Sequence, residues 1–142
     1  MKLMPASTAP AVQQKPIRSP WLTVILAWLV PGAGHFLLGK RGRALIIFAC
    51  VIIAFAVGAL MRGPMFQPTT TGDVLSRLIQ TAGFVGDLAA GLLYFIAVGL
   101  GYWPADEPTH MSDYGSKFLV AAGVINILAM VDACEIATRQ KD

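Results

Sequence analysis

ALIIFACVIIAFAVGALM, residues 44–61, runs for eighteen positions without a charged side chain. At ~1.5 Å rise per residue, a helix of this length reaches across most of a hydrocarbon core of ~30 Å. The whole chain has the same character, since 56% of its 142 residues are hydrophobic and only 13% are charged. A soluble domain has about 25% charged residues. The sequence therefore predicts an integral membrane protein.

The segment before this run, residues 21–39, is apolar but interrupted. It reads WLTVILAWLVPGAGHFLLG and is long enough to cross a bilayer. Pro31 removes a backbone donor, and Gly32 and Gly34 loosen the helix just after it. We expect either a kinked crossing or a shallow re-entrant element.

A short basic connection joins these two segments. Residues 40–43 read KRGR, and Gly39 and Gly42 suit a tight turn. The pattern predicts that residues 21–39 and 44–61 form a helical hairpin.

Two more apolar segments follow, at residues 81–103 and 118–137. Before them, residues 73–80 place apolar side chains on one helical face behind Asp73 as N-cap, which is typical of a short interfacial helix. We therefore predict an all-α fold: an integral membrane helical bundle with four embedded helical segments, the first kinked or re-entrant, plus the short interfacial helix.

The predicted organisation is one transmembrane helical domain, residues 21–137, between two tails. Residues 1–20 are Pro-rich and expected to be flexible, and residues 138–142 are polar. With four crossings, seven of the eleven Lys/Arg residues fall on the side of the termini, which the positive-inside rule assigns to the cytoplasm. A re-entrant first segment would leave three crossings instead.

Polar side chains inside apolar segments are the candidates for function, because a charge at the centre of a membrane helix costs ~2.5–3.5 kcal/mol or more. His35, near the end of the first segment, could bind a metal or a porphyrin-type macrocycle, or relay protons. The structural alternative is a histidine hydrogen-bonded to a carbonyl group freed by the Pro-Gly break. A single histidine without partners at metal-ligand spacing favours the structural interpretation.

Asp87 and Asn126 lie within the third and fourth segments. Asp87 is flanked by small residues that let another helix approach, so it could bind a cation, relay protons or accept a hydrogen bond from a neighbouring helix. We favour the last role. For Asn126 we expect packing and one interhelical hydrogen bond.

Asp132 and Glu135 share a helix face with Arg139 at the end of the fourth segment. Two neighbouring carboxylates could perform acid–base chemistry. Near the membrane interface we expect them to pair with Arg139 or with the basic residues 40–43.

No motif of a catalytic site is present, since the chain lacks a HExxH, a CxxC and a phosphate-binding glycine loop. We expect no enzyme activity, no metal and no cofactor, with His35 as the one candidate cofactor ligand. The basic residues flank apolar runs, so the expected partners are the lipid bilayer, other membrane subunits or further copies of the chain, and not nucleic acid.

The sequence of residues 31–39, PGAGHFLLG, followed by a basic turn and an apolar helix, resembles the bacterial "two-transmembrane domain" hairpin. Residues 123–137 are similar to the end of a related family of uncharacterised bacterial membrane proteins. Leu37 follows Phe36 where the hairpin usually has an aromatic pair, which favours the bacterial group. The resemblance implies a compact hairpin with His35 and the glycines fixing its turn, and it implies no substrate. The predicted location is the cell membrane, as a multi-pass protein of the bacterial inner membrane.

Three functions remain open. The leading hypothesis is a structural or accessory subunit, or a scaffold, that packs against other membrane helices. The alternatives are a small oligomeric carrier or channel using Asp87 and the Asp132–Glu135 pair, and a cofactor-binding subunit using His35. The site candidates are Pro31, Gly32, Gly34, His35, Gly39, Asp87, Asn126, Asp132 and Glu135.

Overall fold

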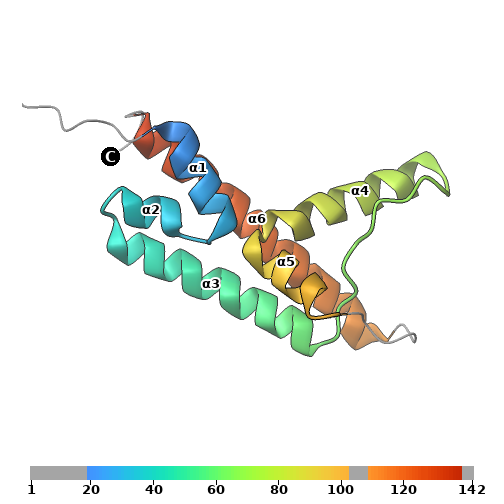
Figure 1. Cartoon of the computed structure of the whole chain (residues 1–142). Coiled ribbons are helices and arrows are strands. Elements are labelled where there is room, and N and C mark those ends of the chain that lie inside the picture. Colours follow the sequence, from blue (N-terminus) through green and yellow to red (C-terminus); the bar gives the residue numbers. More distant parts are fainter. Residues whose placement is uncertain (1–18, 103–108, 139–142) are drawn as a thin grey trace, which may run out of the picture.

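The computed structural model describes residues 19–102 and 109–138. This part of the chain is helical and contains no strand, so the all-α prediction is confirmed for it (Figure 1). The helices are α1 (Pro20–Leu29), α2 (Ala33–Leu37), α3 (Arg41–Leu60), α4 (Val74–Ala89), α5 (Leu92–Gly99) and α6 (His110–Ala137).

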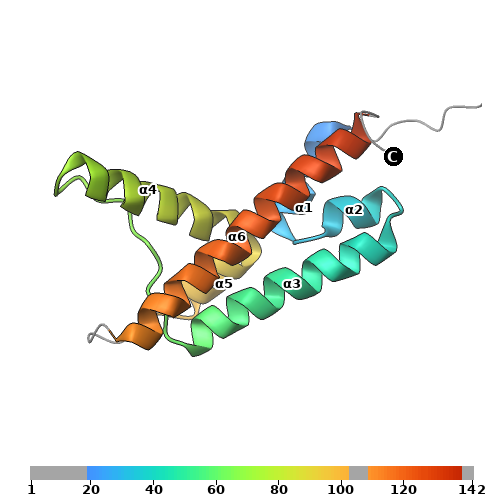
Figure 2. The same cartoon turned by 180° about the vertical axis from the view of Figure 1, so that it is seen from behind.

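Helix α6 is the centre of the bundle, and α1, α3 and α4 all pack against it. Figures 1 and 2 show α3 and α6 lying side by side and running in opposite directions. Small residues allow this close packing: a Cβ atom added at Gly58 would lie 2.8 Å from the carbonyl oxygen of Gly115. Leu119 fills the space beside Gly58 and is 1% exposed.

Helix α6 begins eight residues before the predicted segment 118–137. The side chain of Thr109 accepts a hydrogen bond from the backbone N–H of Ser112, and the Ser112 hydroxyl accepts one from the backbone N–H of Thr109. This capping box fixes the start of the helix in polar sequence.

The predicted segment 21–39 is two helices and not one kinked helix. Helix α1 ends at Leu29, and the chain turns through Pro31 and Gly32 into the five-residue α2. Gly32 has φ 81°, and a Cβ atom there would overlap the carbonyl oxygen of Ala44. Only glycine therefore suits this position.

The predicted segment 81–103 is also divided. The helix starts earlier, at Val74, so the predicted interfacial helix is the first part of α4. The chain then bends by 99° between α4 and α5. Gly91, at the bend, has φ 66°, and a Cβ atom there would overlap the carbonyl oxygen of Trp28.

With these two breaks, the described helices give two or three candidate membrane spans and do not establish four embedded segments. By length and composition, α3 and α6 can cross a membrane, and a third span results only if the bent pair α4 and α5 counts as one. Helix α1 has ten residues, about 15 Å at 1.5 Å per residue, which is half the hydrocarbon core. The start of α1 and the end of α6 lie at the same end of the bundle (Figure 1); the orientation in a membrane stays a prediction.

Candidate functional site

His35 and Asp132 meet between α2 and α6. The imidazole Nε2 of His35 lies 2.8 Å from a carboxylate oxygen of Asp132. Because a carboxylate only accepts hydrogen bonds, the imidazole N–H is the donor. His35 is fully buried, and the guanidinium of Arg43 lies 3.8 Å from the same carboxylate oxygen. Asp132 thus faces two cationic or hydrogen-bonding groups from the α2–α3 region.

Gly34 allows the helix of His35 to come this close to α6. A Cβ atom at Gly34 would lie 2.8 Å from the Cβ of Ala27 and 3.0 Å from that of Ala133. Both distances are below those of ordinary side-chain contacts. Any larger residue at position 34 would push α2 away from α1 and α6, and with it His35 from Asp132.

The sequence suggested that His35 bonds to a backbone carbonyl group freed by the Pro-Gly break. Its partner is instead the carboxylate of Asp132 on α6. Asp132 does pair with the basic connection, through Arg43, whereas Arg139 lies outside the described residues. Glu135 is half-buried one turn further along α6. Nδ1 of His35 is buried without a hydrogen-bond partner in the described structure, and the described residues hold no group of three metal-ligating side chains.

Asn126 lies in the middle of α6 and joins two helix ends. Its side-chain amide donates to the carbonyl oxygen of Trp28 at 3.2 Å and to that of Ala89 at 2.9 Å. Trp28 in turn donates its indole N–H to the carbonyl oxygen of Leu88 at 3.1 Å. Carbonyl groups in the last turn of a helix lack intrahelical partners, so these bonds satisfy the ends of α1 and α4.

We refer to Trp28, Leu88, Ala89, Gly91 and Asn126 as the central junction. Here the start of α5 lies against the end of α1 in space. The rings of Trp28 and Phe95 meet edge to face with centroids 6.1 Å apart. The small Gly123 lets α4 approach, because a Cβ atom there would overlap the carbonyl oxygen of Gly86. The junction therefore fixes α1 and α4 on one region of α6 and holds the start of α5 against the end of α1.

Asp87 is buried on α4, with 2% of its surface exposed. Its carboxylate accepts a hydrogen bond of 2.6 Å from the backbone N–H of Phe66. The ring of Phe66 covers Gly83, and a Cβ atom at Gly83 would overlap the ring atoms. The partner is thus the segment between α3 and α4, and not the neighbouring helix that the sequence suggested.

The candidates do not converge on one site. His35 and Asp132 lie toward the C-terminal end of α6, Asn126 holds the central junction, and Asp87 holds the connection through Phe66. Pro31 and Gly32 form the break between α1 and α2, and Gly39, with φ 79°, lies in the turn before α3. Four of the polar candidates contribute to a tertiary contact: His35, Asp87, Asn126 and Asp132.

Sequence reasoning missed three structural residues. Trp28, Gly91 and Tyr102 lie in the predicted apolar segments 21–39 and 81–103, and no sequence pattern singled them out. The Tyr102 hydroxyl lies within hydrogen-bonding distance of the carbonyl oxygens of Ala59 and Gly63, at 3.2 and 3.1 Å. A glycine directly after two alanines, at the middle of a long apolar run, was the one signal for the bend.

The model of a family of unknown function (DUF6677) matches residues 22–142, and the chain belongs to this family. No curated protein and no solved structure matches the chain significantly. The match covers every described helix apart from the first two residues of α1.

Proposed function

We propose that this member of the DUF6677 family is a membrane-embedded accessory or scaffold protein that packs against the helices of other membrane proteins. The observation that carries the proposal is the first half of α4, which has apolar side chains that the other described residues leave uncovered. A bacterial inner membrane as the location, from the resemblance at residues 31–39, is part of the same proposal.

Only the second half of α4 packs against the bundle. Its buried residues are Gly83, Gly86, Asp87 and Ala89. In the first half, Val74, Leu75, Leu78 and Ile79 are between 54% and 73% exposed. Figures 1 and 2 show this half projecting away from α3 and α6.

The exposed half of α4 is also polar in part, since Ser76 and Arg77 are exposed beside the apolar residues. Lipid tails would cover the leucines but not these groups. A partner helix can offer apolar contact on one side and hydrogen bonds on the other. We call this exposed first half of α4, residues 74–81, the arm. Its mixture of apolar and polar side chains favours a protein partner over immersion in lipid.

The hydrogen bonds that the buried polar side chains form support the same function. Asp132 accepts from His35, Asn126 donates to two helix ends, and Asp87 accepts from Phe66. A carrier would need Asp87 and Asp132 along one path, whereas their hydrogen bonds go to different parts of the chain. These side chains act as internal connections of a rigid body that carries an exposed arm.

Site-specific photo-crosslinking in the membranes of the source cells tests the proposal. A photoreactive phenylalanine analogue is placed at Leu75 or Leu78 of the arm. Ile53 of α3 is the control, because it has similar exposure, 62% against 63% and 64%. We expect one discrete protein adduct, the same from both arm positions, and only lipid adducts from position 53. Lipid adducts alone from all three positions would refute the proposal.

A further inference from the structure

A groove lies between the α1–α2 break and the first half of α3. Its volume is about 480 Å³, within the ~300–1,000 Å³ typical of small-molecule sites. The walls are apolar, and among the residues that line it only one is charged, Arg41. The wall residues that carry the argument are Pro31, Phe36, Leu45 and Phe48.

The groove exists because α2 is short and is turned aside. Gly32 packs directly on Ala44 of α3, and the chain turns here into α2, which ends before the turn that leads to Arg41. The walls are exposed on their outer side: Phe36 is 60% exposed and Leu45 is 69% exposed. The groove therefore opens sideways, beside the first turns of a helix that can cross a membrane.

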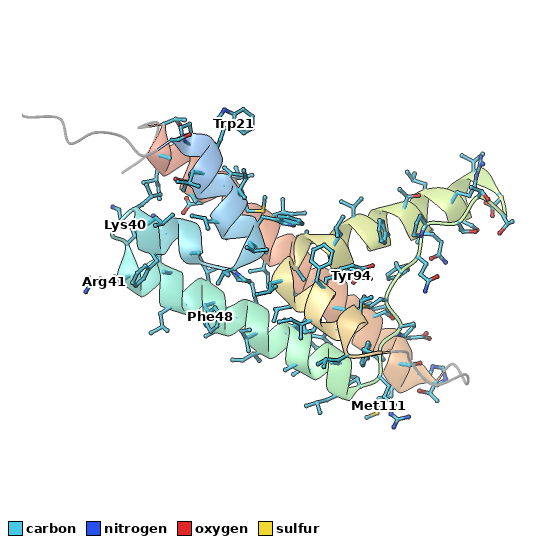
Figure 3. The ribbon with its side chains drawn as sticks, in the orientation of Figure 1. Trp21, Lys40, Arg41, Phe48, Tyr94 and Met111 are labelled. Atoms are coloured by element: carbon cyan, nitrogen blue, oxygen red, sulfur yellow. The ribbon has the colours of Figure 1, made fainter. Side chains whose placement is uncertain are left out.

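Positive charge stands at one end of the groove. Figure 3 shows Lys40 and Arg41 at the turn between α2 and α3, with Phe48 further along α3. The guanidinium of Arg41 lies 5.9 Å from the centre of the Phe36 ring, over an apolar wall. Arg43 differs, because it is directed toward Asp132. Arg41 thus carries its charge at this end of the groove, and Lys40 precedes it in the same turn.

We infer that this groove binds one anionic phospholipid, with an acyl chain along the apolar walls and the phosphate at Lys40 and Arg41. The apolar walls match a hydrocarbon chain, and the lateral opening on a candidate span gives access from the bilayer. Cations near the membrane surface attract anionic headgroups. The cations lie at the start of α3, and the apolar wall follows along its next turns. This order of charge and then apolar surface matches the order of phosphate and acyl chain in such a lipid. This inference does not depend on the scaffold function.

Native mass spectrometry of the full chain in mild detergent measures the binding. The probe is a phosphatidylglycerol with one palmitoyl and one oleoyl chain, and the matched neutral lipid is phosphatidylcholine with the same chains. We expect one phosphatidylglycerol per chain in preference to phosphatidylcholine. In Lys40→Gln/Arg41→Gln, the affinity should fall by about fivefold for each cation, the factor that ~1 kcal/mol per cation represents. Arg62→Gln/Arg77→Gln removes the same charge elsewhere and should keep the preference.

A second pair of variants tests the groove itself. Leu45→Trp fills it, while Ile46→Trp adds the same side chain at the next position of α3, which does not line it. Both positions are exposed, at 69% and 65%, so both variants should fold, and size-exclusion chromatography checks this. We expect Leu45→Trp to lose phosphatidylglycerol and Ile46→Trp to keep it.

Three outcomes would overturn the inference. The first is equal binding of the two lipids, and the second is equal binding by the two tryptophan variants. The third is displacement of phosphatidylglycerol by millimolar inorganic phosphate, which would indicate a phosphate site without a role for the acyl chain.

Discussion

The imidazole of His35 lies 2.8 Å from the carboxylate of Asp132, although 97 residues separate them in the chain. Their hydrogen bond joins the short helix α2 to the end of α6. Since His35 is fully buried, losing either partner leaves a polar group of the other without its bond. The pair thus connects the region of the proposed lipid groove to the central helix.

We predict that Asp132→Leu lowers the stability of the protein by about 1–3 kcal/mol, the cost of leaving the buried imidazole of His35 unsatisfied. Thermal unfolding in detergent measures it. His35→Phe should cost less, because Asp132 is 26% exposed and keeps Arg43 nearby. His35→Phe/Asp132→Leu should cost less than the sum of the two. Additive costs in this double-mutant cycle would show that the two side chains do not interact.

Asn126 connects α6 to the ends of α1 and α4, so Asn126→Leu should loosen both. Hydrogen bonds between membrane helices contribute ~0.6 kcal/mol each on average and up to ~1.7. We expect a loss of about 1–3 kcal/mol for the two bonds, measured by thermal unfolding. Val124→Leu, at an exposed position two residues away, serves as control. Equal stability of the two variants would contradict the role of the junction.

Asp87 should tolerate asparagine but not leucine. Asp87→Asn keeps an oxygen that accepts from the backbone N–H of Phe66, whereas Asp87→Leu leaves this N–H without a partner. We expect unfolding near the parental temperature for Asp87→Asn and a loss of about 1–3 kcal/mol for Asp87→Leu. A folded Asp87→Asn protein that has lost a biological activity would favour a proton or cation role instead.

Asp73 caps the start of α4, outside the apolar part of the helix. Hydrogen bonds from the side chain and the backbone N–H of Ser76 hold the pKa of this carboxyl below its usual value of 3.8. A lowered pKa in the folded state means that the cap is complete above pH 3.8 and is lost as pH falls through the lower value. The NMR shift of the Ser76 amide should therefore titrate with a midpoint below 3.8, and Asp73→Asn should abolish the transition. A midpoint at or above 3.8 would show that the cap does not form.

The sequence was sufficient where one segment determines its own structure. The uncharged run at residues 44–61 predicted α3, because length and hydropathy alone decide whether such a helix can span. Residues 118–137 predicted most of α6, and the missing first turns have polar sequence in which only the Thr109–Ser112 capping box marks the start. Asp73 was identified as an N-cap because capping is a local interaction.

The sequence was insufficient where distant segments meet. The pairing of His35 with Asp132 depends on α2 turning back onto α6, and no local pattern encodes it. The bend at Gly91 falls inside the predicted segment 81–103, and a glycine there does not by itself mark a bend, since small residues suit both close helix packing and backbone with positive φ. Position 91 requires glycine because the carbonyl group of Trp28, from another part of the chain, lies where a Cβ atom would be.

Gly91 is the position where a single methyl group should disturb the fold most. Alanine would have to adopt φ 66° and would overlap the carbonyl oxygen of Trp28. This sparsely populated backbone conformation costs about 1–3 kcal/mol for an L-residue, and overpacking costs about 1–3 kcal/mol more. Gly91→Ala should therefore lower the stability in thermal unfolding by about 2–6 kcal/mol, the sum of these terms. Gly99→Ala, in the last turn of the same α5 and with open space around it, should be neutral or slightly stabilising. If the two alanine variants unfold at the same temperature, the bend between α4 and α5 does not depend on contact with α1.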